Sequence, residues 1–147
     1  MLIVIHLEEI NPDNWRLGLH VKDSQKDYVS DEMRLLARAY AFRNSRSRAV
    51  IIYDGDDAVG MALYYDCDDL KAYEFSQFFI DERYQGKGYG MEATEYILNE
   101  MRRDAKYPKV VLCVIDGNEA AFSLYQKCGF HLTGERDGNE IIMERKL

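Results

Sequence analysis

Residues 85–90 of this chain are Gln85-Gly86-Lys87-Gly88-Tyr89-Gly90, and this stretch decides the fold. A strand-like apolar run, Glu74-Phe75-Ser76-Gln77-Phe78-Phe79-Ile80, precedes it, and a helical pattern over 89–104 follows it. Glycine lacks the Cβ that keeps a ligand off the backbone, and it tolerates positive φ. The first N–H groups of a helix lack intrahelical partners and lie at the positive end of its dipole, so they favour a phosphate. The order of strand, glycine loop and helix therefore predicts a site for a phosphorylated cofactor.

Around this loop, hydrophobic periodicity and turn residues predict an α+β fold with seven strands and about four helices. The strands are expected at residues 2–7, 49–53, 58–65, 72–80, 110–115, 130–136 and 140–146. The helices are expected after the turn Asn11-Pro12-Asp13, over 30–42 with Ser30 as N-cap, over 89–104 and over 119–127. The crossover helix over 89–104 makes its two flanking strands parallel in a sheet that is otherwise mostly antiparallel. A crevice is expected where these two strands splay apart.

The bulk composition bounds the class of protein. The 147 residues are expected to form one domain, 1–147, and 47% hydrophobic with 31% charged residues is a globular balance. A formal net charge of −7 argues against nucleic acid as the main partner; it suits a cationic substrate, and equally a chain that is acidic for solubility. Three cysteines without a CxxC pair and scattered histidines indicate neither a disulfide framework nor a metal site. With no signal peptide and no membrane-spanning run, we expect a cytoplasmic protein without membrane contact.

The glycine loop fits two cofactor interpretations. Gly88-Tyr89-Gly90-Met91-Glu92-Ala93 matches the G-x-G-x-x-A dinucleotide pattern, and Asp116 lies at a suitable distance downstream. That pattern requires its strand to run almost directly into the first glycine, whereas this strand ends near Ile80. The dinucleotide interpretation is therefore disfavoured.

A second motif follows about thirty residues after the loop. It is Asn118-Glu119-Ala120-Ala121-Phe122-x-x-Tyr125-x-x-x-Gly129-Phe130. Together with Gln85-x-x-Gly88-x-Gly90 after a strand ending in Phe-Phe-Ile-Asp, it resembles the GCN5-related N-acetyltransferase (GNAT) family. The resemblance extends from about Ala49 to the C-terminus.

The resemblance implies an acetyl-CoA site between the fourth and fifth strands. The backbone of Phe79 and Ile80 would pair with the pantetheine arm, as would the side chain of Asn118. The loop that begins at Gln85 would hold the pyrophosphate through amides of Gly86, Lys87, Gly88, Tyr89 and Gly90, with Met91 opening the helix beneath it. The Tyr125 hydroxyl would approach the thioester sulfur as general acid. The residues alone leave Tyr125 open as a core aromatic and Asn118 as a helix N-cap.

The amine also needs a group that accepts its proton, because only a neutral amine attacks a thioester. The family often places a Glu or a water-held polar residue on the fourth strand, and Glu74 is the candidate here. By the period of two, Glu74 shares a strand face with Ser76 and Phe78, and Ser76 or Gln77 could relay the proton through water. A solvated strand carboxylate is the alternative for Glu74.

The segment Val21-x-x-x-Gln25-x-x-Tyr28-Val29 resembles the bacterial spermine/spermidine acetyltransferase branch of the family. The resemblance implies that Gln25, Tyr28 and Glu32, with Glu74, form the acceptor site for a polyamine. Carboxylates that could pair with its ammonium groups are Asp27, Asp31, Glu32, Asp66, Asp68, Asp69 and Glu74. Another small amine, an amino acid or a protein N-terminus remains open as acceptor, and so does a non-catalytic acetyl-CoA sensor. Members of this family are often dimers, so a homodimer is possible.

Overall fold

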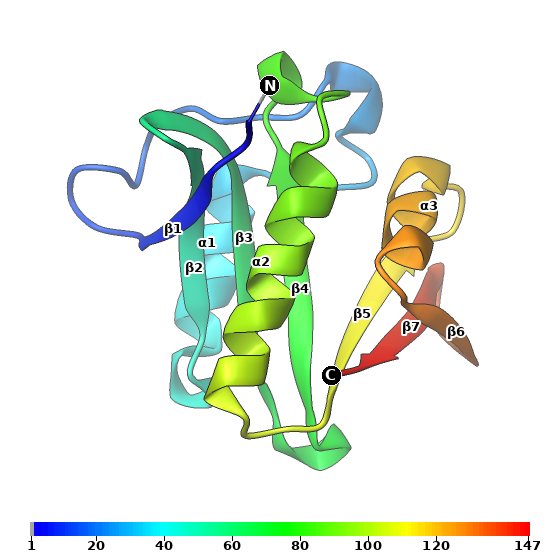
Figure 1. Ribbon diagram of the computed structural model, residues 1–147. Coiled ribbons are helices and arrows are strands. Elements are labelled where there is room, and N and C mark those ends of the chain that lie inside the picture. The colour runs from blue at the N-terminus through cyan, green and yellow to red at the C-terminus, as the bar shows by residue number, and fades with distance from the viewer. Residues whose placement is uncertain (1) are drawn as a thin grey trace.

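The computed structural model describes residues 2–147 as a seven-stranded sheet with helices on both faces (Figure 1). The strands are β1 (Ile5–Glu9), β2 (Arg48–Asp54), β3 (Asp57–Cys67), β4 (Ala72–Ile80), β5 (Lys109–Ile115), β6 (His131–Asp137) and β7 (Glu140–Lys146). The α-helices within residues 2–147 are α1 (Glu32–Ala41), α2 (Tyr89–Asp104) and α3 (Glu119–Lys127). Short 3-10 turns are η1 (Asp23–Gln25), η2 (Arg43–Ser45), η3 (Asp68–Leu70) and η4 (Glu82–Tyr84). The strand order β1-β2-β3-β4-β5-β7-β6 and the parallel β4–β5 pair confirm the predicted α+β architecture.

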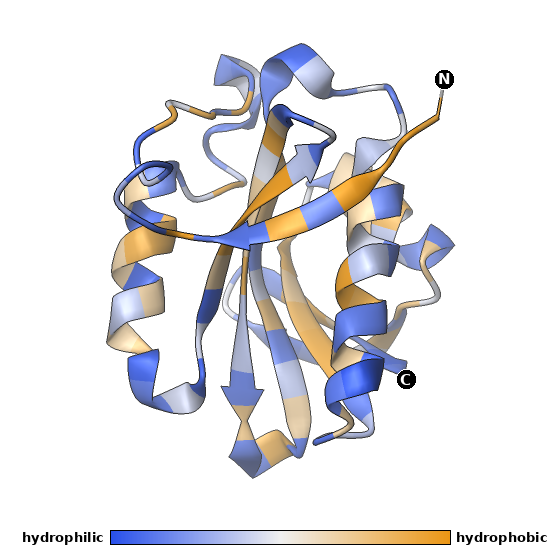
Figure 2. Cartoon of the chain, turned by 60° about the vertical axis from the view of Figure 1, so that its left-hand side comes forward, coloured by the Kyte–Doolittle hydropathy of each residue, from blue (hydrophilic) through white to orange (hydrophobic). Residues whose placement is uncertain are grey.

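Each face of the sheet buries its own hydrophobic cluster, and Figure 2 shows the sheet lying between α1 and α2. On one face, Leu35 of α1 is completely buried among side chains of β2 and β3. On the other face, α2 contributes Ala93, Ile97 and Met101, which is the stripe that helical periodicity predicts. Among residues 2–147, every helix falls short of the length or apolar character that a membrane crossing requires.

The parallel strands β4 and β5 pair over a very short distance. Their register consists of Tyr73 with Val110 and Glu74 with Val111, after which the strands separate (Figure 1). A β-bulge on β4 interrupts the pairing with β3 between Leu63 and Tyr64. The C-terminal half of β4 therefore lies free of β5, as the predicted crevice requires.

The same bulge makes one prediction wrong. Strict alternation would place Phe78 on the face of Glu74, but the extra residue of the bulge shifts the pattern by one. Phe78 instead packs beside Phe75, with ring centroids 5.4 Å apart, on the α2 face. Glu74 lies opposite Tyr65 on the α1 face.

The N-terminal segment departs from the prediction in two places. No α-helix follows Pro12, because the Asn11 side chain accepts hydrogen bonds from the N–H groups of Asp13 (2.8 Å) and Asn14 (3.1 Å). Such a turn competes with helix formation. The second helix is capped by Asp31 and not by Ser30, since the Asp31 carboxylate accepts from the Arg34 N–H at 2.8 Å.

A cluster of ion pairs closes the end of the sheet where β4 and β5 still pair. The Asp66 side chain, only 4% exposed, accepts from Arg46, Arg48 and Lys106 at 2.7, 3.3 and 2.8 Å. Arg46 also binds Asp104 at the C-terminal end of α2 at 2.9 Å. Burial alone would raise the pKa of Asp66, but hydrogen bonds from Arg46 and Lys106 bring it below its usual value. Asp66, one of the carboxylates considered for pairing with a polyamine, is therefore held in this cluster and is not free for that role.

Candidate active site

A cavity of about 770 Å³ fills the space between the diverging ends of β4 and β5. Its walls come from β4, β5, α3, the glycine loop, α1, the segment after η1 and the β6–β7 turn. The predicted site residues that line it are Gln25, Tyr28, Glu74, Phe79, Ile80, Gln85, Gly86, Gly88, Tyr89, Gly90, Asn118 and Tyr125. The fold thus brings residues that are a hundred positions apart to one opening.

The glycine loop takes a backbone path that favours glycine. Gly86 and Gly88 have φ of +75° and +93°, and Gly88 is the N-cap residue of α2. The first backbone bond of the helix runs from the Glu92 N–H to the Gly88 carbonyl at 3.2 Å. The N–H groups before Glu92 therefore point out of the helix end without intrahelical acceptors.

Gly90 serves α3 as well as the loop. A Cβ at Gly90 would lie 3.3 Å from the Leu124 Cδ2, tighter than an ordinary contact, so glycine lets α3 approach α2 beside the cavity.

The Tyr89 side chain points away from the cavity, because its hydroxyl donates to the Asp54 carboxylate at 2.6 Å. That bond, with burial second, raises the pKa of Tyr89 to about 12. Tyr89 therefore anchors the start of α2 while leaving its backbone available.

Gln85 connects the two sides of the cavity. Its side-chain amide donates to the Ile80 carbonyl and to the Gln25 Oε1, each at 2.9 Å. Gln25 also accepts from the Lys22 N–H at 3.1 Å. The segment around η1 is thereby attached to the loop that leads from β4 to α2.

These features fit acetyl-CoA. Beyond Glu74 and Val111 the strands no longer pair, so backbone groups on the β5 side of β4 are open to a pantetheine amide. The N-terminus of α2 offers several N–H groups and a positive dipole end to a diphosphate. Phe79 and Ile80 lie on the first wall, and Gly86 to Gly90 lead to the second.

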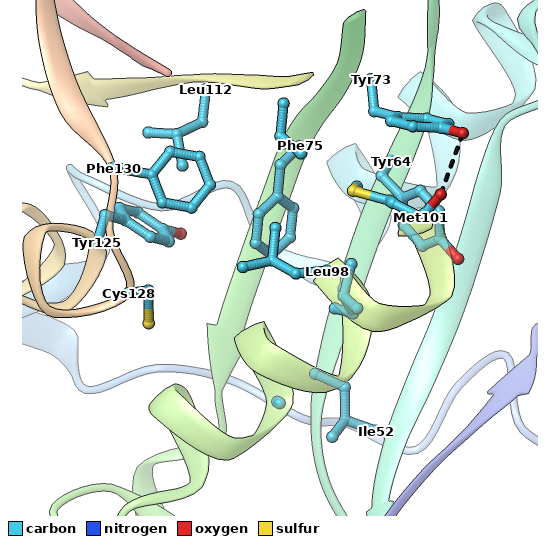
Figure 3. Packing of buried hydrophobic residues seen from close by; sticks show 14 of the residues in the cluster. Ile52, Tyr64, Tyr73, Phe75, Leu98, Met101, Leu112, Tyr125, Cys128 and Phe130 are labelled. Carbon is cyan, nitrogen blue, oxygen red and sulfur yellow. Dashed lines mark hydrogen bonds between the residues drawn. The ribbon is translucent and has the colours of Figure 1, made fainter. Parts of the chain in front are cut away.

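Tyr125 lies deep in the cavity wall on α3. Its ring meets Phe75 and Phe130 edge-on, with centroids 6.1 and 5.7 Å apart (Figure 3). The residue is 8% exposed and lines the cavity. Burial, with a smaller effect of Cys128, raises the pKa of Tyr125 far above its ordinary value. The phenol is therefore protonated at neutral pH, as an ordinary tyrosine also is.

Asn118 begins the same helix two turns earlier. Its side-chain oxygen accepts from the Ala121 N–H at 3.3 Å, which is the N-cap that the sequence leaves open for it. The side chain also lines the cavity, so its amide NH₂ remains able to donate to a ligand. Capping and ligand binding are compatible in this geometry.

The end of the cavity near α1 carries charges of both signs. Glu74 and Ser76 of β4 line it, with Cys113 of β5. Burial first, and then the Glu140 and Glu74 carboxylates, raise the pKa of the Cys113 thiol to about 11, so both carboxylates lie near this thiol. Further charged residues on the walls are Lys26, Asp27, Arg34, Arg38 and Asp137.

Some predicted residues do not line the cavity. Lys87 is exposed, with its ammonium 5.8 Å from the Tyr84 ring centroid, and Met91 is also exposed. Glu32 is half-buried at the start of α1, outside the lining. Of the carboxylates proposed for a polyamine, only Asp27 and Glu74 line the walls.

Other wall residues escaped the sequence reasoning. Arg34 and Arg38 lie four residues apart on α1, a spacing that could have indicated a shared face. Asp137 and Glu140 flank the β6–β7 turn, and no local pattern connects that turn with Glu74. Their proximity is a product of the sheet order.

Comparison with known proteins agrees with this geometry. The profile of the Acetyltransferase (GNAT) family matches residues 7–130. The spermine/spermidine N(1)-acetyltransferase of Bacillus subtilis (strain 168) is 32% identical over 152 residues, which cover 97% of this chain and 99% of that protein.

Two solved structures illustrate the likeness in fold. The spermidine N-acetyltransferase of Vibrio cholerae in complex with CoA and spermine has a TM-score of 0.76 at 19% identity, covering 97% of this chain and 95% of that one. The aminoglycoside acetyltransferase AAC(6')-Ib in complex with coenzyme A has a TM-score of 0.80 at 13% identity, with 97% and 95% covered. Their different acceptors mean that the fold alone does not select the amine.

The family match spans β1 through α3 and so includes the glycine loop, Glu74 and Tyr125. The geometry of the loop and of the open β4 edge supplies the physical reason for that match. The chain belongs to the GNAT acetyltransferase family and is an acetyl-CoA-dependent N-acetyltransferase.

Proposed function

We propose that this enzyme acetylates a primary amine of a polyamine such as spermine or spermidine, with Tyr125 as general acid and Glu74 receiving the proton of the amine. One observation carries the proposal: the glycine loop, Tyr125 and Glu74 line a single cavity although they come from different elements. The choice of a polyamine is supported by the name of the Bacillus subtilis relative, which is similar over nearly the whole chain.

Acetyl-CoA supplies the acetyl group as a thioester. The free N–H groups at the start of α2 hold its diphosphate, and the Ile80 N–H on the open edge of β4 aligns the pantetheine arm, while the Ile80 carbonyl is held by Gln85. The predicted role of the Phe79 backbone is wrong, because the Asp81 N–H bonds to the Val59 carbonyl and the alternation of the ladder turns the Phe79 backbone toward β3 as well.

Tyr125 is protonated at neutral pH, as a tyrosine with an ordinary pKa of about 10 already is, and it can give that proton to the departing thiolate. The rings of Phe75 and Phe130 fix the direction of the phenol.

The amine must lose a proton before it attacks. An alkyl ammonium has a pKa of about 10.4, so almost none of it is neutral at pH 7. Glu74 lies half-buried on the acceptor side of β4, where its carboxylate attracts the ammonium. The proton passes to Glu74 directly or through the polar side chains of Ser76 and Gln77, which line the same wall.

A polyamine carries further ammonium groups, and each is costly to desolvate without a partner. Glu140 and Asp137 extend the row of carboxylates beyond Glu74 along the β7 side of the cavity. Arg34 and Arg38 line the α1 side, where they repel a second ammonium. The acceptor tail is therefore expected to run along the strands and not along α1.

An acceptor panel tests the proposal. The wild-type protein is assayed for CoA release with spermine, spermidine, aminoglycosides, amino acids and peptides. The proposal expects kcat/KM for a polyamine to exceed the other classes by about tenfold or more. A higher kcat/KM for another class would overturn the acceptor, and acetyl-CoA binding without any turnover would favour a sensor.

A matched pair of variants tests the acceptor wall. Glu140→Gln is expected to raise KM for spermine several-fold with little change in kcat. Asp56→Asn, in the exposed β2–β3 turn outside the cavity, removes one charge elsewhere and serves as control. If both substitutions raised the KM for spermine equally, Glu140 would act only through the net charge of the protein and not by binding the amine.

We also propose that two copies associate. Strand β6 forms one edge of the sheet and is exposed along almost its whole length. Such an edge offers unpaired N–H and C=O groups to a second chain. Light scattering during gel filtration would overturn this if it gave the mass of a single chain.

A further inference from the structure

Tyr65 carries a buried polar group that the proposed mechanism does not use. The residue is 3% exposed in the middle of the α1-side cluster. Its hydroxyl is shielded from solvent and has no hydrogen-bond partner among residues 2–147. A buried hydroxyl without a partner is rare, because it loses its bonds to water without replacement. Such a group either lowers the stability of the folded protein or has a role in the active site.

The position of Tyr65 points to that task. In the β3–β4 register, Tyr65 lies directly opposite Glu74, so their side chains emerge on the same face of the sheet. Burial first, and then the Glu74 carboxylate, raise the pKa of Tyr65, in keeping with that register. Ser76, the polar residue at the bulge of β4, and Arg38 of α1 lower the pKa of Tyr65.

The ring of Tyr65 is also fixed in direction. It stacks on the Phe42 ring with centroids 4.3 Å apart and an interplanar angle of 6°. Phe42 is the C-cap residue of α1, so the stack ties the phenol to the end of that helix. A ring held in this way keeps its hydroxyl at a constant place beside β4. Glu74, whose flexible side chain is only half-buried, is the partner that can move.

We propose that Tyr65 is the positioning residue of Glu74: its hydroxyl donates a hydrogen bond to the Glu74 carboxylate and holds it, ionised, beside the attacking amine. The inference rests on the proposed role of Glu74. Tyr65 itself lies behind the cavity wall and touches neither the amine nor acetyl-CoA, since it is not among the lining residues. Donation to the ionised form stabilises that form, so the carboxylate stays ready to accept a proton.

Other charged and titratable groups surround Glu74. From α1 come Arg34 and Arg38, from β5 comes Cys113, and from β7 comes Glu140. The arginines also favour the ionised carboxylate, whereas Glu140 opposes it. The hydroxyl of Tyr65 differs from these groups because it is uncharged and shielded from solvent, and because Tyr65 lies directly opposite Glu74 in the strand register. Its removal should therefore change the pH profile without changing the net charge of the site.

The test compares Tyr65→Phe with Tyr64→Phe. Both substitutions remove one phenol oxygen from β3, but Tyr64 lies in the cluster on the other face, beside Phe75. Tyr65→Phe is expected to lower kcat/KM for the best amine by about tenfold at pH 7. Its acid limb should move to higher pH, because a carboxylate without its donor holds a proton more tightly. The Kd for acetyl-CoA should stay the same, and Tyr64→Phe should match wild type.

A double-mutant cycle separates this inference from the function on which it rests. If Glu74→Gln keeps the wild-type rate, the assignment of Glu74 fails and the inference falls with it. If Glu74→Gln is impaired but Tyr65→Phe retains the wild-type rate and acid limb, only the inference is overturned. In the Glu74→Gln background, Tyr65→Phe should change kcat/KM by less than about twofold. A full additional loss there would mean that Tyr65 acts on the fold and not through Glu74.

Discussion

Replacing Tyr125 with phenylalanine is expected to remove a proton donor and to leave the packing intact. The ring is held edge-on by Phe75 and Phe130, contacts that phenylalanine can make equally well (Figure 3). The substitution removes one oxygen and no carbon atom from this buried residue. The free energy of unfolding should therefore fall by less than about 1 kcal/mol.

The loss in rate follows from the chemistry of the leaving group. A general acid typically contributes about 10²–10⁴-fold. A thiolate is a good leaving group, since a thiol has a pKa of about 8.5, so the lower end applies here. We expect kcat to fall about 10²-fold, which corresponds to about 2.7 kcal/mol of transition-state stabilisation.

The assay measures CoA release at saturating acetyl-CoA and spermidine, with calorimetry of CoA binding and thermal unfolding alongside. Tyr96→Phe on α2, outside the cavity, is the control for loss of a tyrosine oxygen. In the wild type, burial raises the pKa of Tyr125, so its ionisation should not cause a fall in rate near neutral pH. The reasoning is refuted if Tyr125→Phe retains kcat within twofold of wild type while CoA binding is unchanged.

Three further predictions concern the frame of the site. Asp66→Asn should destabilise the fold by about 2 kcal/mol, less than a fully buried pair because its cationic partners are nearly half exposed. Because the pKa of Asp66 is lowered in the folded state, its contribution to stability is present above pH 4 and is lost as the pH falls further. Urea unfolding should therefore show a smaller difference in unfolding free energy between wild type and variant at pH 3 than at pH 7. Gly88→Ala forces a side chain into φ +93° at the loop and should raise the Kd for acetyl-CoA by calorimetry, whereas Gly55→Ala, equally left-handed but in the β2–β3 turn, should not. Gln85→Ala frees Gln25 and should raise both the Kd for acetyl-CoA and the KM for the amine, and a change confined to one of them would contradict a link between the two walls.

The sequence predicted what depends on local chemistry. Glycines at 86, 88 and 90 before a helical stripe identify the loop, because few backbones other than a ligand cradle need them in that order. The Tyr-x-x-x-Gly-Phe motif likewise placed Tyr125 on the correct helix face. The loop prediction rests on spacing within one turn, whereas the role of Tyr125 was implied by the resemblance to the GNAT family.

The failures all involve competition that the local pattern does not reveal. The Asn11 side chain forms a turn where a helix was predicted, and Asp31 caps the second helix in place of Ser30. The bulge on β4 moved Phe78 to the other face, although the alternation of its neighbours gave no sign of it. The burial of Asp66 could not be predicted, because its three cationic partners are distant from it in the sequence.

Helix α2 runs from the glycine loop at its N-terminal end to the ion-pair cluster around Asp66 at its C-terminal end. At its C-terminal end, Arg46 binds Asp104, and the Tyr73 hydroxyl bonds to the Met101 carbonyl at 3.3 Å (Figure 3). Those contacts hold the helix to the part of the sheet where β4 and β5 are still paired. The N-terminal end of the same helix must stay free of capping partners if its N–H groups are to hold a diphosphate. Fixing the helix at its C-terminal end through Arg46 and Asp104 leaves the N–H groups at its N-terminal end open for a ligand.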